Sequence, residues 1–318
     1  PLLLTSSFVS VLAAFLFLRA SNISLLIVAR GLEGLAWACF WPPMEALATE
    51  TANGGEMGRG AGLVTTVYAI AFAVGSVAGG SLSDLLGLRP TFGLYLVIAA
   101  SSTLTVPFIQ DPRRLKAPDY PAKRSPFSRF FSRPLVLGYF LGGSETFGFA
   151  TVMALLAVFA SLLGVPVFWI GIVFSVFWVG RILSGTLAGV ASDRFGRKRV
   201  AILALALGFA GYLAFVFALD LLLLAVVALL VGLSIGAIYP VNLALIADNI
   251  EPELRGGAMG IYEMTCAITF MISSAIGGLA AEAINSRTPY ALAGLVYFLS
   301  GVALQHSLRQ TRESSRSP

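Results

Sequence analysis

The sequence predicts an all-α polytopic membrane protein. Of its 318 residues, 57% are hydrophobic and only 12% are charged, and the mean hydropathy is +0.87. A soluble domain cannot place so many apolar residues in its core and on its surface. The apolar runs also reach the roughly 20 residues that a helix needs to cross a lipid bilayer, whereas the strands of a membrane barrel would be short and alternating. The bilayer is therefore the first expected partner of this chain.

Apolar runs that end at charges or turn residues predict ten membrane spans. They cover residues 2–18, 23–48, 58–82, 89–109, 134–162, 166–189, 200–219, 221–247, 256–281 and 289–307. The seventh and eighth spans are divided at Asp220, the only charge in a run that is too long for one crossing. We therefore expect a tight turn at this residue.

Most of the 21 Lys and Arg residues fall in loops on one side of these spans. By the positive-inside rule that side is cytoplasmic, so both ends of the chain are cytoplasmic and the protein lies in the plasma (inner) membrane. The longest polar stretch contains seven basic residues and four prolines, which is typical of a flexible linker. We expect an N-terminal bundle at 1–109, a basic cytoplasmic linker at 110–133, a six-helix bundle at 134–307 and a cytoplasmic tail at 308–318.

The two bundles are related by an internal repeat. One gap-free offset places Gly34 on Gly232 and Trp41 on Tyr239, and it also aligns glycine pairs and charged residues further along. Because the second bundle begins near Pro134, the same offset places the start of the first bundle upstream of the first residue, with room for two more spans. We therefore expect ten of twelve helices, with the first two absent.

A basic hairpin, residues 189–199, concentrates charge between two apolar spans. Its glycines permit a close backbone approach, and its aspartate can interact with the next helix N-terminus or with the neighbouring arginines. Such a cluster can form in one conformation and break in another, as a gate requires, whereas a purely topogenic anchor needs only the basic residues. The candidate gate residues are Gly189, Asp193, Arg194, Gly196, Arg197, Lys198 and Arg199, with Arg181 toward the cytoplasmic end of the sixth span, where it can snorkel or close a gate.

Three patterns resemble signatures of one transporter family. The basic hairpin matches GxxxDRxGRRR, and the second span matches RxxxG at Arg30 and Gly34. The third span matches a glycine signature of proton-driven exporters at Gly62, Gly75, Gly79 and Gly80, with Ala71 and Ser76 in place of a glycine and a proline. On these motifs the chain resembles the major facilitator superfamily over essentially its whole length. The resemblance implies two bundles with parallel pseudo-repeats, a central cavity lined by the second span, a cytoplasmic gate at the basic hairpin and alternating access.

Arg30 lies about a third of the way into the second span, where an unpaired charge costs about 2.5 to 3.5 kcal/mol on insertion scales. Glu33 is one helical turn away, so the two side chains can pair. Gly34, Trp37 and Trp41 continue the same face. We expect this face to line the substrate cavity, with a purely structural ion pair as the alternative.

Glu145 lies in the middle of the fifth span, between glycines that can let the helix bend. A carboxyl group in hydrocarbon surroundings can be neutral or charged as its partners move, as proton coupling requires. Glu145 is therefore the predicted proton carrier, with an interhelical hydrogen bond as the alternative, and Glu263 near the cytoplasmic end of the ninth span is a second candidate. In the eighth span Tyr239 and Asn242 flank a proline on the repeat of the tryptophan face, where Asn242 is available to a polar substrate.

The sequence offers little material for catalysis. The only histidine is His306, Cys39 and Cys266 lie apart inside apolar runs, and no phosphate-binding loop or nucleophile and base pair is visible. We expect neither an enzyme nor a metal site, a cofactor or a nucleic-acid partner, since topology explains the net charge of +5.

The main hypothesis is a monomeric secondary active transporter, coupled to protons, that moves small organic solutes by alternating access. The aromatic face and the partial exporter motif favour efflux of drugs or metabolites. Uptake of a polar metabolite is the alternative within this class. A membrane sensor or scaffold that does not transport is the alternative from another class.

Overall fold

The structure is a computed structural model that describes residues 2–50, 57–109, 127–251 and 254–314. Within these ranges the chain is helical with no strands. Ten of the helices are long and apolar enough to cross a membrane. The predicted all-α polytopic fold is confirmed, and the chain divides into two compact units at residues 1–119 and 120–318.

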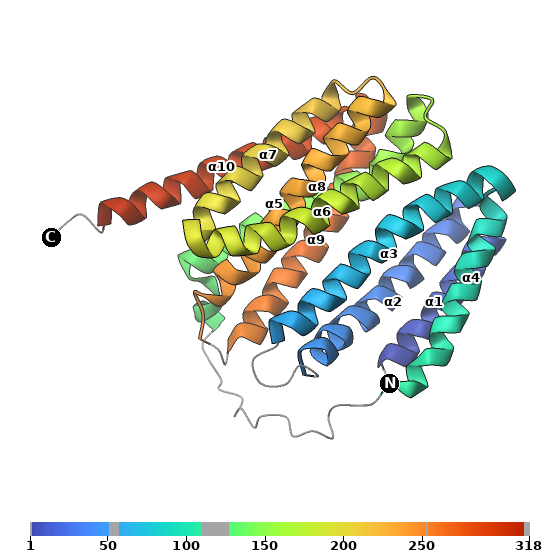
Figure 1. The fold of residues 1–318 in the computed structure, drawn as a ribbon, viewed down its shortest axis with the longest axis horizontal. Coiled ribbons are helices and arrows are strands. Elements are labelled where there is room, and N and C mark those ends of the chain that lie inside the picture. The colour runs from blue at the N-terminus through green and yellow to red at the C-terminus, as the bar shows by residue number, and fades with distance from the viewer. Residues whose placement is uncertain (1, 51–56, 110–126, 252–253, 315–318) are drawn as a thin grey trace. The chain divides into compact units, whose positions relative to one another are not determined.

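The first unit holds four long helices (Figure 1). They are α1 (Leu2–Arg19), α2 (Ile23–Glu50), α3 (Met57–Leu86) and α4 (Leu88–Thr105), and the short helix η1 (Val106–Phe108) follows α4. Helix α1 packs against both α2 and α4, and α3 packs against α2 and α4. The Ser6 hydroxyl of α1 donates a 2.7 Å hydrogen bond to the Ala36 carbonyl of α2, and Phe17 stacks on Phe92 of α4 with ring centroids 5.4 Å apart.

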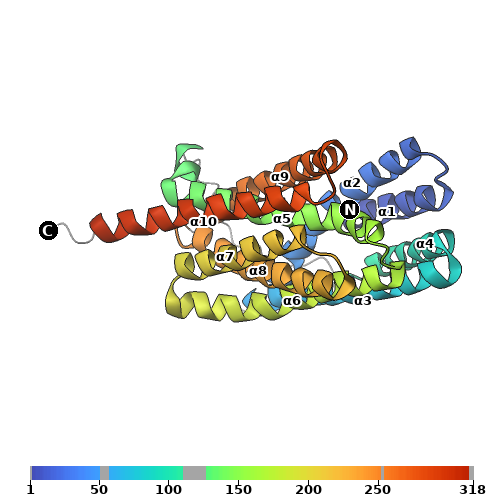
Figure 2. The same cartoon turned by 90° about the horizontal axis from the view of Figure 1, so that it is seen from above.

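The second unit holds six long helices. A short helix, η3 (Phe127–Phe131), is followed by α5 (Arg133–Leu162), α6 (Val167–Phe195), α7 (Arg197–Val216), α8 (Leu221–Ala247), α9 (Arg255–Ala283) and α10 (Thr288–Ser314). Within this unit α10, α7, α8 and α6 follow one another in Figure 2, and each neighbouring pair is packed. Helix α8 also contacts α5, and its apolar 18-residue stretch has a mean hydropathy of 2.9, the highest among the ten candidate spans of the described residues.

Glycines allow α8 to lie very close to α6. A Cβ atom at Gly232 would collide with the backbone carbonyl of Phe177, and one at Gly236 would collide with the carbonyl of Arg181. In a membrane, helices associate through such close packing because lipid tails are as apolar as the side chains. The glycines therefore fix the position of α6 beside α8.

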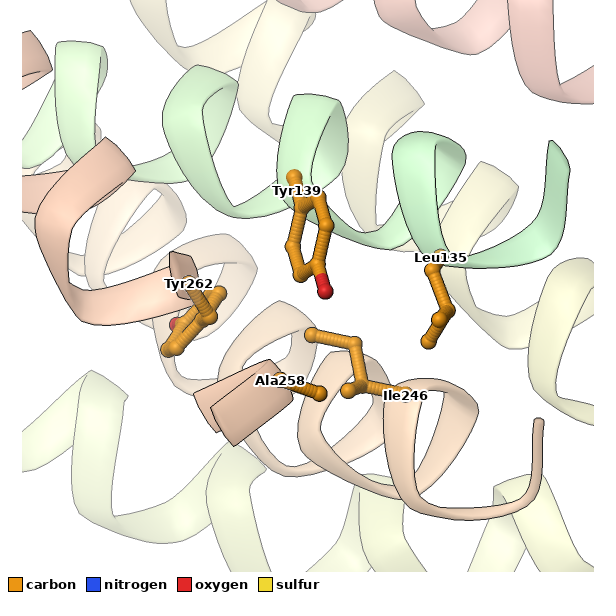
Figure 3. Packing of buried hydrophobic residues seen from close by; sticks show 5 residues of the cluster. All are labelled: Leu135, Tyr139, Ile246, Ala258 and Tyr262. Carbon is orange, nitrogen blue, oxygen red and sulfur yellow. The ribbon is translucent and has the colours of Figure 1, made fainter. Parts of the chain in front are cut away.

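A buried cluster joins α5, α8 and α9 near one end of the second unit (Figure 3). Leu135 and Tyr139 project from α5 toward Ile246 of α8 and toward Ala258 and Tyr262 of α9. All five residues are at most 6% exposed. The cluster packs the first part of α5, the helix that carries Glu145, against α8 and α9.

The tight turn predicted at Asp220 is confirmed. Helix α7 ends at Val216 and α8 begins at Leu221. The Asp220 carboxylate caps α8, because its Oδ1 accepts a 2.8 Å hydrogen bond from the Leu223 amide. This cap satisfies one of the amides that the first turn of a helix leaves unpaired.

The basic hairpin is more helical than expected. We predicted that the sixth span ends at residue 189 and that the seventh begins at residue 200, but α6 continues to Phe195 and α7 begins at Arg197. Only Gly196 separates them, with φ of 94°. Charged side chains mark where a helix leaves the hydrocarbon, but they do not break it, whereas a left-handed glycine does.

Part of the expected linker and tail lies outside the described residues. This holds for residues 110–126 of the linker and for residues 315–318 of the tail. Residues 127–131 of the linker form η3, and α10 continues to Ser314 through most of the expected tail.

Candidate functional site

Glu145 is a buried carboxyl group near the middle of α5. The residue is 4% exposed. Its Oε2 accepts a long hydrogen bond of 3.4 Å from the Thr146 hydroxyl, and Oε1 has no hydrogen-bond partner in the part of the chain that the structure describes. Buried polar atoms are normally paired, and an ionisable side chain inside a membrane span is a functional candidate for that reason.

Arg181 of α6 interacts electrostatically with Glu145. Its guanidinium carbon lies 4.6 Å from the ring centroid of Phe149, 5.2 Å from that of Trp178 and 5.9 Å from that of Tyr239. One of its terminal nitrogens, Nη1, is buried and has no hydrogen-bond partner among the described residues. The cation is therefore held mainly by aromatic rings.

Arg181 was expected toward the cytoplasmic end of a span that closes at residue 189, and this place in the membrane stays a prediction. Because α6 runs from Val167 to Phe195, this residue lies at the midpoint of the helix. A guanidinium nitrogen of this residue is buried among aromatic rings, so the side chain packs inside the second unit. Its assignment to the gate stays a prediction.

The backbone around Glu145 is approached closely by tyrosines of neighbouring helices. The Tyr297 hydroxyl of α10 donates a 3.4 Å hydrogen bond to the Glu145 carbonyl. A Cβ atom at Gly142 would collide with the ring of Tyr262 in α9 and would lie 2.9 Å from the Asn242 amide nitrogen. The glycines beside Glu145 thus admit large side chains against a helix that is continuous from Arg133 to Leu162.

The remaining predicted residues of the second unit lie on α8 and α9. Tyr239 belongs to the ring set around Arg181, and Glu263 interacts electrostatically with Glu145 from an exposed position in α9. Asn242 is fully buried, and neither atom of its amide has a hydrogen-bond partner among the described residues. The structure therefore brings Glu145, Arg181, Tyr239 and Glu263 into one region and places Asn242 against α5.

In the first unit, the predicted pairing of Arg30 with Glu33 is confirmed. The Arg30 Nη1 atom lies 2.5 Å from the Glu33 Oε2 atom. The guanidinium also lies 5.7 Å from the ring centroid of Phe17 in α1, and the Tyr95 hydroxyl of α4 interacts with Glu33. The Arg30 side chain is 75% exposed in this unit.

The tryptophans of α2 form an aromatic surface together with α3. Trp37 and Trp41 are stacked, with ring centroids 5.3 Å apart and an interplanar angle of 8°. Tyr68 of α3 contacts both rings at 5.7 and 5.2 Å, and Phe72 lies 4.7 Å from Tyr68. The sequence-based reasoning missed Tyr68 and Phe72, although both lie on one face of the third span at a spacing of one turn.

Arg197 is the centre of the basic hairpin. It forms an ion pair of 2.6 Å with Asp193 and one of 3.2 Å with Asp248, just after the end of α8, and it donates a 2.7 Å hydrogen bond to the Ser192 hydroxyl. The predicted pairing of Asp193 with Arg197 is therefore confirmed. The pairing with Asp248 was not predicted, because this residue lies at the end of another helix, 51 residues further along the chain.

The other hairpin residues flank this ion-pair cluster. Lys198 donates a 3.1 Å hydrogen bond to the Ser307 hydroxyl of α10, and Arg194 and Arg199 are exposed. The N-cap of α7 is Gly196, with no side-chain cap, so Asp193 does not cap that helix. The space that a Cβ atom at Gly189 would occupy is open among the described residues, and no close approach explains this glycine there.

No metal-ligand cluster is found in the described ranges. Groups of three or more His, Cys, Asp or Glu side chains close enough to hold an ion are absent there. Cys39 and Cys266 are free thiols, and both are partly buried.

Comparisons with known proteins relate the whole chain to one family. The sequence model of the Major Facilitator Superfamily matches residues 1–176 and residues 144–318. The chain is 24% identical over 237 residues to "Uncharacterized MFS-type transporter YfkF" of Bacillus subtilis (strain 168), and the alignment covers 72% of this chain and 58% of that protein.

Two further relatives carry names that refer to drugs. One is "Multidrug resistance protein 1" of Bacillus subtilis (strain 168), which is 28% identical over 149 residues, or 47% of this chain and 37% of that protein. The other is "Multi-drug resistance efflux pump PmrA" of Streptococcus pneumoniae, which is 30% identical over 172 residues, or 52% of this chain and 41% of that protein. The chain therefore spans less than two thirds of the length of each of these three relatives.

Proposed function

This chain belongs to the major facilitator superfamily, and from this premise we propose that it works as a secondary active transporter that exports small amphipathic organic compounds in exchange for protons. The ten long apolar helices among the described residues, together with the family, make it an integral membrane protein. The proposed exchange takes place by alternating access across the plasma (inner) membrane, with both ends of this chain in the cytoplasm.

The observation that carries the proposal is the environment of Glu145. This carboxyl group is buried near the middle of α5, and its Oε1 atom has no hydrogen-bond partner in the described part of the chain. Arg181 interacts electrostatically with this carboxyl group, and a carboxyl group that gains or loses a cationic neighbour changes its affinity for a proton. A small movement of Arg181 relative to Glu145 can therefore cause Glu145 to release or bind a proton, which is the elementary step of proton coupling.

The aromatic surface of the first unit supports amphipathic substrates. Trp37, Trp41 and Tyr68 offer flat apolar rings, and the Arg30 and Glu33 pair beside them on α2 offers both signs of charge. Efflux is favoured over uptake because two relatives are named for multidrug resistance or efflux. The ion pairs of Arg197 with Asp193 and Asp248 are the proposed cytoplasmic gate.

Uptake of a polar metabolite is a second candidate. Asn242 favours it, because both amide atoms are buried without hydrogen-bond partners among the described residues and can bind a polar solute. A sensor or scaffold that does not transport remains the competing hypothesis from another class.

Reconstitution of the full-length protein into proteoliposomes tests the proposal. A pH-sensitive dye trapped inside reports proton movement when amphipathic cations, amphipathic anions, sugars or amino acids are added across an imposed pH gradient. We expect amphipathic compounds to drive proton movement, and Glu145→Gln to reduce it to the level of protein-free vesicles. Glu282→Gln is the matched control, because it removes an exposed carboxylate at the end of α9 in the same unit.

The outcomes separate the hypotheses. Proton movement that survives Glu145→Gln contradicts coupling through this residue. Proton movement driven only by sugars or amino acids supports uptake of a polar metabolite instead. If no solute moves protons and no solute is exchanged, the sensor or scaffold hypothesis replaces transport.

A further inference from the structure

We propose that Phe149, Trp178 and Tyr239 form a binding site for organic cations, and that the guanidinium of Arg181 is an internal occupant which the substrate displaces. The proposal rests on the proposed transport function and names its substrate class. We call these three rings the aromatic cage.

The geometry of the aromatic cage suits a cation. Its rings come from three helices, α5, α6 and α8, and their centroids lie 4.6, 5.2 and 5.9 Å from the guanidinium carbon. Positive groups are attracted to the face of an aromatic ring within about 6 Å of its centroid. Rings from three separate helices around one positive group are an arrangement that recognises positive charge without requiring hydrogen bonds.

The walls of the aromatic cage are held in place by further rings. Phe149 stacks on Phe177 at 6.2 Å and meets Trp178 and Phe270 edge to face at 6.0 and 6.2 Å. Trp178 is 1% exposed and lies nearly perpendicular to Phe177. A site built from packed rings is preorganised, so a ligand loses little affinity to ordering them.

Arg181 occupies the aromatic cage without satisfying all of its hydrogen-bond donors. Its Nη1 atom is buried and has no hydrogen-bond partner among the described residues, and a buried donor without a partner is destabilising. A quaternary or arylated cation carries no N–H donors, so it can occupy the same rings without this penalty. The aromatic cage therefore favours such a cation over the guanidinium that now occupies it.

Displacement of Arg181 links cation binding to Glu145. The two side chains already interact electrostatically, and the Glu145 Oε1 atom has no hydrogen-bond partner in the described ranges. A guanidinium that leaves the aromatic cage can pair with this oxygen and stabilise the carboxylate, so that the Glu145 proton passes to solvent. Binding of one cation then releases one proton, which is the stoichiometric basis of an exchange.

Equilibrium binding of tetraphenylphosphonium to the purified full-length protein tests the proposal. Tetraphenylborate serves as the anion of nearly the same shape. We expect the cation to bind and the anion not to compete. Arg181→Met replaces the internal cation with an uncharged, flexible side chain, so it should tighten tetraphenylphosphonium binding by about tenfold, because no cation of the protein then competes for the rings. Arg181→Lys keeps a competing cation and should bind more weakly than Arg181→Met.

Two matched ring substitutions provide the second measurement. Phe149→Leu removes one wall of the aromatic cage and should weaken binding by about tenfold. Phe298→Leu is the same change in the same unit, at a half-exposed ring of α10 that pairs with Phe209, and it should leave binding unchanged. If Arg181→Met does not fold, the comparison of Phe149→Leu with Phe298→Leu decides whether the aromatic cage binds the cation.

Several results would contradict the proposal that the aromatic cage binds organic cations. They are an Arg181→Met variant that binds the cation no more tightly than the parent, equal effects of Phe149→Leu and Phe298→Leu, or competition by tetraphenylborate. Binding needs no gradient, so failure of the two proposals can be told apart. Cation binding without proton movement contradicts transport alone, whereas proton-coupled transport that Phe149→Leu does not change contradicts the aromatic cage alone.

Discussion

Gly196 is the one residue that turns the chain from α6 into α7. Its φ of 94° and ψ of 137° lie in a region that side chains with a Cβ atom rarely adopt. The basic residues on either side are compatible with a helix, so the turn depends on this glycine and not on charge. The neighbouring Gly189 has neither a positive φ nor a close contact among the described residues.

We therefore expect Gly196→Ala to destabilise the protein by about 1 to 3 kcal/mol, the usual range for a residue forced into such a backbone conformation. Thermal unfolding in detergent, followed by tryptophan fluorescence, measures the change. Gly189→Ala is the control in the same hairpin, and it should be neutral or slightly stabilising because alanine is the better helix former. Equal effects of the two substitutions would contradict the backbone explanation.

The candidate sites show which side-chain contacts a sequence reveals. Arg30 and Glu33 are one helical turn apart, so their pairing follows from helical spacing. Tyr95 and Phe17 complete that site from other helices, and no local pattern places them there. In the second unit the same holds for Phe149, which looks like an ordinary apolar residue of α5 until α6 brings Arg181 over its ring.

At the scale of helices, the close packing of α6 against α8 depends on glycines, which have no Cβ atom. A Cβ atom at Gly232 would collide with the Phe177 carbonyl, which belongs to the backbone and cannot rotate away. We expect Gly232→Ala to destabilise the protein by about 1 to 3 kcal/mol, as overpacking in a close interface does. The melting temperature and the yield of monodisperse protein in detergent report the effect.

Gly278→Ala is the comparison for this substitution. It places the same methyl group on α9, where a Cβ atom meets nothing within 4 Å among the described residues. A Gly278→Ala variant as unstable as Gly232→Ala would show that helical glycines matter here for a reason other than the contact with α6.

Helix existence and helix ends were predictable to different degrees. The ten spans follow from apolar runs, because crossing a bilayer imposes a minimum length on each helix. The turn at Asp220 follows from one charge that caps a helix. The end of α6 was predicted too early, because a helix continues into water as long as its residues allow it.

At the scale of the whole molecule, the internal repeat was visible before the structure, since it rests on positions of glycine, proline and aromatic residues. The family follows from a match over the full chain. How each unit builds its site could not be predicted, because Glu145, Arg181 and Tyr239 are far apart in sequence and meet only through the packing of α5, α6 and α8.

The orientation of the whole chain in the membrane leads to the last prediction. Basic residues gather on both sides of Gly196 before α7, so this turn is predicted to be cytoplasmic. Because α7 and α8 are each expected to cross the bilayer once, the segment after α8 is predicted to be on the same side and the turn between α7 and α8 outside. Leu219 and Asn249 are both exposed and lie beyond opposite ends of α8. In a background with Cys39→Ser and Cys266→Ser, a membrane-impermeant maleimide should label Leu219→Cys in intact cells, and Asn249→Cys only after permeabilisation.

The reverse pattern would invert the topology and place the hairpin around Gly196 outside, where it could not serve as a cytoplasmic gate. Labelling of both variants in intact cells would mean that α8 does not span the bilayer, although its length and the mean hydropathy of 2.9 over 18 of its residues suit a spanning helix.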